Sequence, residues 1–369
     1  MRAGSRQSAA ALCAAVFFCA SAAAQPVWGE AEMRASRVVH YAPGALPDAP
    51  AFAADPLNLF IVVEAGDDHV TLLDGDRLEP IHRFASRPSL QGDPQFSPEG
   101  RYVFFASREG WIAKFDLWNL KTVAEVRAGS DTRSLAASSD GRFVAVGNAV
   151  PAALVVLDAD LQPVKLLAAT DTANRRTSPV SQVRSAAARR SFVAALPDLR
   201  EIWEVSYDPA APEIAQGWVH DYKLREGRFV PGFLNPRRSP LDDAIEDFRL
   251  LPDGRRLAGV ARGGDRGQVI HLDVRRRISS LDRDRFEAIG SPDPEIVARL
   301  QAATGTALAD VSFDRHGRYA LASLPGTPDT LIVYGTSTLR EVKRLSVRKL
   351  MGKYNVFNQI RRHSGNYSP

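Results

Sequence analysis

The hydrophobic positions of this chain gather in short runs that are separated by polar turns. Four of the runs follow a Gly-Arg turn and share one pattern: SPEGRYVFFAS (97–107), SSDGRFVAVGN (138–148), LPDGRRLAGVA (251–261) and FDRHGRYALAS (313–323). Val, Ile, Leu and Phe dominate these runs and favour strands, and the Asp-Gly-type turns favour hairpins. The pattern therefore predicts β-meanders and not βαβ units.

Each Gly-Arg run is followed by two further strand patterns. The second runs are 111–120, 153–161, 268–276 and 330–339, and third runs such as 123–129 and 163–169 come next. Two more copies lack the Gly-Arg pair: 57–84 and 188–208. The first two Gly-Arg turns are about 40 residues apart, which is the period of a propeller blade. We therefore predict an all-β fold, a β-propeller of four-stranded blades, with six repeats visible and up to eight accommodated by the length.

Two segments interrupt this rhythm. Residues 217–250 read as a long polar insertion with several prolines, and residues 282–309 contain a helix-like stretch from Pro294 to Ala303. Loops of this length in a compact fold are often functional, and the alternative is that they cap or close the ring.

The N-terminus has the features of a secretory signal. Residues 1–24 contain two arginines, an apolar run over 9–20, and the triplet Ala22-Ala23-Ala24. This run is shorter than a bilayer span, so we predict a signal peptide at 1–24 and export to the periplasm, with an uncleaved anchor as the alternative. Residues 25–369 then form the propeller domain, and no later stretch predicts a membrane span.

Composition narrows the chemistry that the exported part can perform. The chain is 45% hydrophobic and 24% charged, enough for a sizeable core. Its formal net charge of +4 owes two units to the leader, so we expect no nucleic-acid partner. Both cysteines, Cys13 and Cys19, also lie in the leader. Residues 25–369 therefore cannot form a disulfide, a thiolate metal site or a CxxCH attachment for covalent c-type haem.

Seven histidines are scattered through different repeats without HExxH or similar spacing, so no protein-only metal site is predicted. His220, beside Asp221 and Tyr222 in the insertion, is the histidine to test as a catalytic group, against a purely structural role. The chain has no G-x-S-x-G elbow and no P-loop, and no G-x-G-x-x-G follows a strand. These absences argue against hydrolase, NTPase and Rossmann functions.

Two arginines stand at corresponding places in consecutive repeats. Arg108 follows the first Gly-Arg strand in ASREGW, and Arg133 follows a strand in GSDTRS. We expect both near strand ends, where a propeller exposes its middle. Guanidinium groups that converge there suit a planar ligand with several carboxylates, because each can hold one carboxylate bidentately. The alternative is that they are solvated surface arginines.

A longer run of residues resembles a known family. The stretch GRYVFFASREGWIAKFDLWNLKTVAEVRAGSDTRS (100–134) resembles the haem d1 propeller of cytochrome cd1 nitrite reductase and its relatives NirF and NirN. Near the C-terminus, TLIVYGTSTLREVKRL (330–345) and GKYNVFN (352–358) are similar to the closing segment of that family. The likeness covers roughly residues 55–281 and 308–360.

The resemblance implies a periplasmic, eight-bladed propeller that holds haem d1 or its dihydro precursor. In the family, arginines bind the carboxylates of the tetrapyrrole, and Arg108 and Arg133 match two of them. A histidine ligates the iron from the proximal side, but here Gln91 or Gly92 stands near that position. The distal histidines of the family have no counterpart, because the chain passes through 282–309 to its last repeat.

Three hypotheses follow from this resemblance. The first is a NirF-like or NirN-like protein of haem d1 biosynthesis that matures the cofactor or binds its precursor. The second is a degenerate propeller that has lost haem ligation and serves as a protein-interaction platform. The third, a nitrite reductase, fits least well with the missing histidines. The expected partners are a tetrapyrrole and either nitrite reductase or a small cytochrome c, and the resemblance leaves a carrier and a side-chain dehydrogenase equally open.

Overall fold

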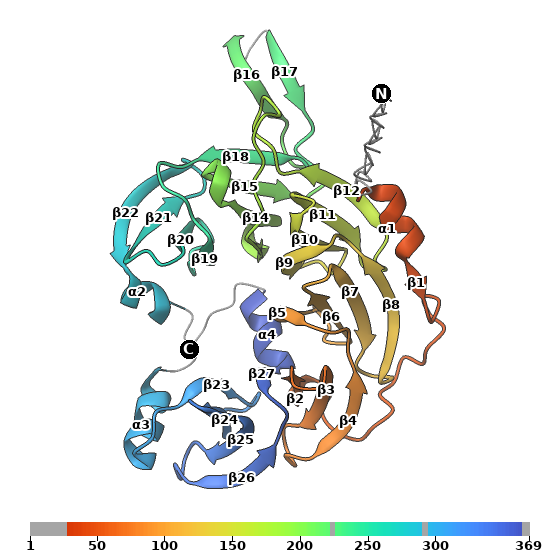
Figure 1. Ribbon diagram of the computed structural model, residues 1–369, viewed down its shortest axis with the longest axis vertical. Coiled ribbons are helices and arrows are strands. Elements are labelled where there is room, and N and C mark those ends of the chain that lie inside the picture. The colour runs from red at the N-terminus through yellow and green to blue at the C-terminus, as the bar shows by residue number, and fades with distance from the viewer. Residues whose placement is uncertain (1–27, 222–225, 290–293, 364–369) are drawn as a thin grey trace, which may run out of the picture.

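The computed structural model describes residues 28–221, 226–289 and 294–363. Within these ranges, six antiparallel sheets stand around a ring like the blades of a propeller (Figure 1). Five of them have four strands, and the other has the same four and a short fifth strand. The all-β prediction and the four-stranded blades are therefore confirmed.

We number the blades I to VI along the chain. Blade I contains β27 (Leu350–Asn355), β2 (Leu59–Glu64), β3 (His69–Asp74) and β4 (Pro80–Ala85). Blade II contains β5 (Leu90–Phe96), β6 (Tyr102–Ser107), β7 (Trp111–Asp116), β8 (Lys121–Arg127) and the short β1 (Val38–Val39). Blade III contains β9 (Asp131–Ala137), β10 (Phe143–Val150), β11 (Ala153–Asp158) and β12 (Pro163–Ala168).

The second half of the ring repeats this order. Blade IV contains β13 (Gln182–Ala186), β14 (Ser191–Leu196), β15 (Glu201–Ser206) and β18 (Pro236–Pro240). Blade V contains β19 (Asp247–Leu250), β20 (Arg256–Val260), β21 (Arg266–His271) and β22 (Arg276–Asp282). Blade VI contains β23 (Ala309–Phe313), β24 (Tyr319–Leu324), β25 (Thr327–Gly335) and β26 (Glu341–Ser346).

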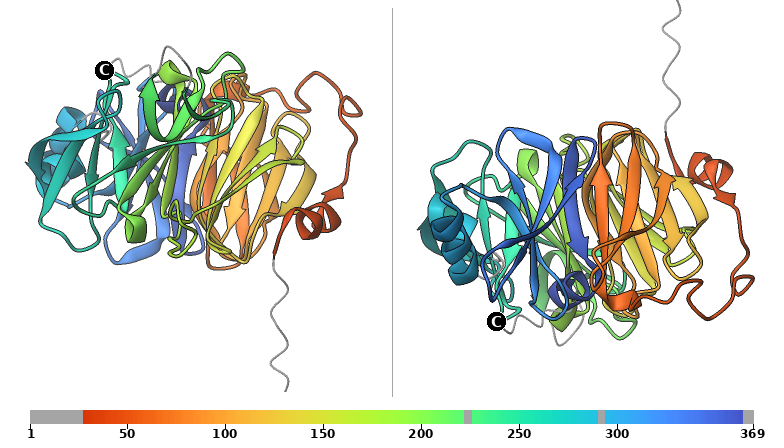
Figure 2. Two further views of the ribbon diagram at one scale, coloured as in Figure 1. Left: turned by 90° about the horizontal axis from the view of Figure 1, so that it is seen from above. Right: turned by 90° about the horizontal axis from the view of Figure 1, so that it is seen from below.

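The inner strand of each blade was the strand that the hydrophobic pattern did not show. The Gly-Arg runs became the second strands, β6, β10, β20 and β24. The inner strands β5, β9, β19, β23 and β27 lie nearest the middle of the ring (Figure 1). They carry polar stretches such as QGDP in β5 and DTRS in β9, because their edges face the middle and not a neighbouring blade. Figure 2 shows the ring from its side, with the strands crossing its thickness.

The ring closes by pairing the two ends of the chain in blade I. The closing strand β27 pairs antiparallel with β2 and becomes the inner strand of that blade. The buried Asn355 side chain donates from Nδ2 to Asn58 Oδ1 at 3.2 Å and accepts from the Asn358 backbone N–H at 3.2 Å, which starts helix α4 (Val356–His363). A Cβ atom at Gly352 would lie 2.3 Å from the Tyr354 hydroxyl. These contacts explain the Gly and the first Asn of GKYNVFN.

Neighbouring blades pack through shared apolar cores. Phe84 of blade I stacks on Phe115 of blade II with ring centroids 4.0 Å apart. Blades III and IV bury Trp203 and Tyr207 in their common core. Further cores join blade II to III, blade IV to V, and blade I to VI. Burying such large side chains is the main favourable term for assembly of the ring.

Between blades V and VI the described residues form no common core. The face of blade V is covered by α2 (Arg283–Ala288), whose Phe286 is fully buried against Ala258 and Val260. The face of blade VI is covered by α3 (Pro294–Thr304), which buries Leu300. The predicted helix at 294–303 is confirmed. Short helices thus take the place of a neighbouring blade at this junction, where the apolar faces would otherwise meet water.

The predicted insertion at 217–250 is largely blade material, so that prediction is wrong for most of its length. Only β16 (Ile214–Asp221) and β17 (Glu226–Val230) form an added hairpin, which projects outward from the rim in Figure 1. The rest supplies β18 of blade IV and β19 of blade V. Prolines at both ends of β18 are tolerated because β18 is an edge strand.

The chain before blade I wraps the outer side of blades II and III. Helix α1 (Glu30–Ser36) buries Met33 against the core of these blades, and β1 extends blade II by pairing with β8. Three short 3-10 turns complete the elements: η1 (Pro56–Asn58), η2 (Ala187–Arg189) and η3 (Pro197–Leu199). The predicted signal peptide, 1–24, lies outside the described residues. No helix in the described ranges has the length and hydropathy needed to cross a membrane.

Candidate functional site

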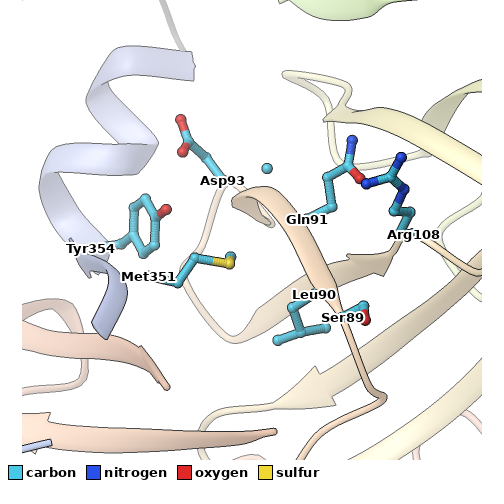
Figure 3. Close-up of a pocket in the computed structure, with 8 residues that line it drawn as sticks. Ser89, Leu90, Gln91, Asp93, Arg108, Met351 and Tyr354 are labelled. Carbon is cyan, nitrogen blue, oxygen red and sulfur yellow. The ribbon is translucent and has the colours of Figure 1, made fainter. Parts of the chain in front are cut away.

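A cavity of about 450 Å³ opens at the inner ends of blades I and II, a size typical of small-molecule sites. Blade II supplies most of its lining and β27 supplies the rest (Figure 3). The lining residues are Ser89, Leu90, Gln91, Gly92, Asp93, Arg108, Met351 and Tyr354. Three of them, Gln91, Gly92 and Arg108, are residues that the sequence singled out.

Irregular pairing in two strands shapes the cavity. In β5 the register with β6 shifts between Gln91 and Gln95, and in β27 the register with β2 skips Met351. Such bulges turn side chains away from the regular alternation and are common beside functional sites. Gly92 has φ of +70°, and a Cβ atom there would meet open space. Because Gly92 has no side chain, the cavity is open to solvent at this point.

Arg108 stands immediately after β6, as expected. Its backbone N–H donates to Ser89 O at 2.9 Å, and its carbonyl accepts from Thr132 N at 3.0 Å, so its Cα is held by blades II and III together. Its side chain is exposed, and in the described residues it has no ion-pair partner. The backbone is thus fixed while the guanidinium remains available to a ligand.

Arg133 lies within β9, whereas the sequence placed it after a strand. Its Nη2 contacts Asp131 Oδ2 at 2.6 Å. Its Nε is buried and has no hydrogen-bond partner in the described residues. A buried unpaired donor is costly, so this atom is suited to an acceptor that the protein itself does not supply.

Gln91 connects the two arginine segments. Its Nε2 donates to the backbone carbonyl of Arg133 at 3.1 Å, and its side chain lines the cavity beside Arg108 (Figure 3). The structure therefore places the predicted residues Gln91, Arg108 and Arg133 near one another, although of these three only Gln91 and Arg108 line the cavity itself.

Asp93 and Tyr354 form the opposite side of the cavity. Burial raises the pKa of the Tyr354 phenol above its usual value, and the negative charges of Asp93 and Asp310 add to the shift. Arg184 of β13 lies 3.9 Å from Asp93, between Nη1 and Oδ2. Tyr354 therefore stays protonated at neutral pH next to a half-exposed carboxylate.

His220 does not join this site. It lies on β16 of the projecting hairpin, away from the inner strands in Figure 1, and its side chain is outside the described residues. No histidine lines the cavity, and in the described ranges no three His, Cys, Asp or Glu side chains form a metal cluster. Arg238, from the predicted insertion, lies on the outer strand β18 and stacks over Trp203 at 4.6 Å.

The sequence did not identify Asp93, Met351 or Tyr354 as site residues. Asp93 and Met351 lie in the irregular parts of β5 and β27, which carry no periodic signal. Tyr354 belongs to GKYNVFN, whose only signal in the sequence is its likeness to the closing segment of the family. The pairing of β27 with β2 in blade I places Tyr354 and Met351 beside β5. These residues are far apart along the chain, so their spacing in the sequence could not have shown that they meet.

The residues present fit a planar, carboxylate-bearing ligand such as a tetrapyrrole. The available guanidinium of Arg108 and a wall that contains Gly92 line one opening, and the unpartnered Nε of Arg133 lies behind Gln91, outside the lining itself. Arginine holds carboxylates bidentately and can also stack on a π-face. The arrangement supplies binding and orientation, and it supplies one carboxylate, Asp93, that can accept a proton.

Comparison with known proteins agrees with this chemistry. Residues 54–229 and 236–359 match the family described as cytochrome D1 heme domain. The dihydro-heme d1 dehydrogenase of Pseudomonas aeruginosa is 39% identical, covering 91% of this chain and 78% of the relative. That alignment spans 409 positions, more than the 369 residues of this chain, so the relative contains segments that this chain lacks.

Two further comparisons point to the same family. Protein NirF of Pseudomonas aeruginosa is 32% identical over 54% of this chain and 46% of its own length. Among solved structures, the dihydro-heme d1 dehydrogenase NirN in complex with DHE superposes with a TM-score of 0.75 at 36% identity, covering 92% of this chain and 84% of that one. Both names occur in the resemblance that the sequence suggested.

Proposed function

This chain belongs to the family of cytochrome d1 haem domains, and from that premise we propose that it binds dihydro-haem d1 in the cavity of blades I and II and acts in haem d1 biosynthesis. The observation that carries the proposal is the position of Arg108. Its backbone is fixed by two blades and its guanidinium is unpaired in the described residues, at the mouth of a cavity of ligand size.

We assign the carboxylates of the macrocycle to Arg108 and, through its unpaired Nε, to Arg133. Hydrogen bonds between charged groups contribute about 1.5–3 kcal/mol each. Arg108 is then a binding residue that also fixes the orientation of the ring plane. Support for dihydro-haem d1 as the ligand comes from the 36% identical structure of NirN, which is a complex with DHE.

We further propose that the reaction is the dehydrogenation named for the 39% identical relative. Dehydrogenation of a dihydro compound removes two protons and two electrons. Asp93 is the carboxylate at the cavity that can accept one of the protons, and its Oδ2 lies 3.9 Å from Nη1 of Arg184. The other proton passes to solvent, and the two electrons pass one at a time to two molecules of an oxidised small cytochrome c, each of which takes one electron. We propose that residues 1–24 direct the chain to the periplasm.

An absorption titration tests the proposal. Purified protein is titrated with dihydro-haem d1, and we expect saturable changes in its Soret and long-wavelength bands. Arg108→Ala should weaken binding roughly 10- to 100-fold, corresponding to about 1.5–3 kcal/mol. Arg344→Ala is the matched control, because Arg344 is exposed on the outer strand β26 and pairs with Glu341.

Two further measurements test whether the protein dehydrogenates its ligand. Formation of haem d1 on addition of an oxidised cytochrome c would support dehydrogenation, and loss of that conversion in Asp93→Asn would identify the base. If the protein shows no spectral change with either tetrapyrrole, and a protein complex free of tetrapyrrole is isolated, the chain is an interaction platform and the proposal is wrong.

A further inference from the structure

The geometry points to Met351 as an axial ligand of the iron of a haem bound in the cavity. This inference rests on the proposed function, because it concerns how the same cavity holds its ligand. It assigns a role to a residue that neither the hydrophobic pattern nor the spacing of the chain singled out.

The position of Met351 in β27 is unusual. Val63 pairs with Gly352 and Glu64 pairs with Leu350, so Met351 is the unpaired residue of a β-bulge. Met351 is 37% exposed and lines the cavity, where its side chain lies beside Tyr354 and extends toward β5 (Figure 3). The other methionine in the described ranges, Met33, is fully buried in the core under α1.

No other lining residue offers the iron a comparable ligand. The lining contains no histidine or cysteine. The Gln91 amide is oriented by its bond to the Arg133 carbonyl, and an amide is a weak donor to iron. The Tyr354 phenol is held protonated by burial and by the charges of Asp93 and Asp310, so it is not available as a phenolate. The Asp93 carboxylate is already close to Arg184.

The thioether has the right chemistry for this task. Sulfur ligands are soft and favour reduced iron, and methionine is an established axial ligand of haem. A neutral thioether adds no charge beside Asp93 and Tyr354, so it can approach the iron without a further partner. A β-bulge on a closing strand of the ring also holds the sulfur on a rigid support, which ligand geometry requires.

The alternative is that Met351 only forms part of the apolar wall of the cavity and does not ligate the iron. A wall and a ligand differ in two respects. A wall contacts the macrocycle whether or not iron is present, whereas a ligand acts only through the iron. A wall is also replaced by leucine at little cost, whereas a ligand is not.

The experiment compares iron-bearing and demetallated dihydro-haem d1 as probes of the full-length mature protein. The variants are Met351→Leu and Met351→His, and Met33→Leu is the control methionine. Absorption, magnetic circular dichroism and electron paramagnetic resonance report the spin state and the sulfur-to-iron charge-transfer band. The affinity for each probe comes from the same titrations.

For the wild type and Met33→Leu we expect the sulfur-to-iron charge-transfer band. Met351→Leu should lose that band and bind the iron-bearing probe at least several-fold more weakly, with unchanged affinity for the demetallated probe. Met351→His should replace the band by the spectrum of nitrogen ligation and restore the affinity for the iron-bearing probe, which shows that the position and not the fold determines the result.

The outcomes separate this inference from the proposed function. If the wild type binds both probes and Met351→Leu has the same spectra and affinities, Met351 is a wall and only the inference is overturned. If the wild type binds neither probe, the proposed function fails and the inference fails with it. Weakening of both probes by Met351→Leu would also overturn ligation, because it would indicate general contact with the macrocycle.

Discussion

Gln91 of β5 donates a hydrogen bond from Nε2 to the backbone carbonyl of Arg133 of β9, at 3.1 Å. Inner strands of adjacent blades share no backbone ladder, so side chains must connect them. The same device recurs at the next two junctions. Ser134 Oγ accepts from Val183 N at 3.0 Å, and Gln182 Oε1 accepts from Phe248 N at 2.6 Å. These three side chains therefore connect the inner ends of blades II to V.

Removing the hydrogen bond between Gln91 and Arg133 should lower the affinity for the ligand more clearly than it lowers the stability of the fold. Gln91→Leu keeps the volume but leaves the Arg133 carbonyl without this donor, which costs about 1 kcal/mol of the free energy of unfolding. Urea unfolding measures that loss. Because Arg133 then loses its fixed position, the affinity for dihydro-haem d1 should also fall several-fold. Gln182→Leu, which breaks the bond between blades IV and V, should lower stability without the effect on affinity, and equal losses of affinity would contradict the role of Gln91.

The cap on blade V should be as important as a blade-to-blade contact. Phe286 is fully buried, and Arg249 donates to the Phe286 carbonyl at 2.9 Å and stacks on its ring at 4.8 Å. Phe286→Ala should destabilise the protein by about 3–5 kcal/mol, because it opens a cavity under α2. Differential scanning calorimetry measures the change. Phe286→Leu should retain most of the stability, and an alanine variant as stable as the wild type would show that α2 is not a cap.

The buried ammonium of Lys353 should make stability depend on Asp310. The Lys353 side chain is inaccessible to solvent, and its Nζ lies 2.8 Å from Asp310 Oδ2, so the pair joins β27 to blade VI. Asp310→Asn leaves this ammonium without a counter-charge, and we expect a loss of about 3 kcal/mol at neutral pH. In Lys353→Met the same Asp310→Asn change should have little effect. Denaturant unfolding of the four variants gives this double-mutant cycle.

The lowered pKa of Lys353 also makes the free energy of unfolding depend on pH. Burial lowers the pKa of Lys353 below its usual 10.5, while the unfolded chain keeps the usual value. Between the two values the unfolded state binds more protons, so the contribution of Lys353 to stability rises with pH in that alkaline window. Lys353→Met should remove this rise. A profile unchanged by the substitution would contradict the burial of a charged lysine.

Tyr354 should act in the opposite direction at high pH. Its pKa in the folded state is raised above the usual value of 10.0, so the folded state binds more protons above pH 10. Its contribution is present below pH 10 and is lost as the pH rises through this range. Tyr354→Phe should therefore lose less stability on going from pH 9 to pH 11 than the wild type does. Circular dichroism of urea unfolding at the two pH values provides the comparison.

The local elements could be predicted because local rules specify them. The Gly-Arg turns and the apolar runs after them fixed β6, β10, β20 and β24, since turn chemistry and burial on both faces leave a clear pattern. The run from 294 to 303 has helical character and forms α3. The inner strands escaped prediction because their polar edges face the middle of the ring and show no alternation.

The sequence by itself determined the strand repeats and the family, and it predicted Arg108 and Arg133 as binding residues. The tertiary structure alone decided that Gln91 joins those arginine segments and that β27 brings Met351 and Tyr354 to the same cavity. It also decided that α2 and α3 cover the faces of blades V and VI. The physical reason is that ring closure joins residues nearly three hundred positions apart, such as Asn58 and Asn355, and no local preference records which strand completes blade I.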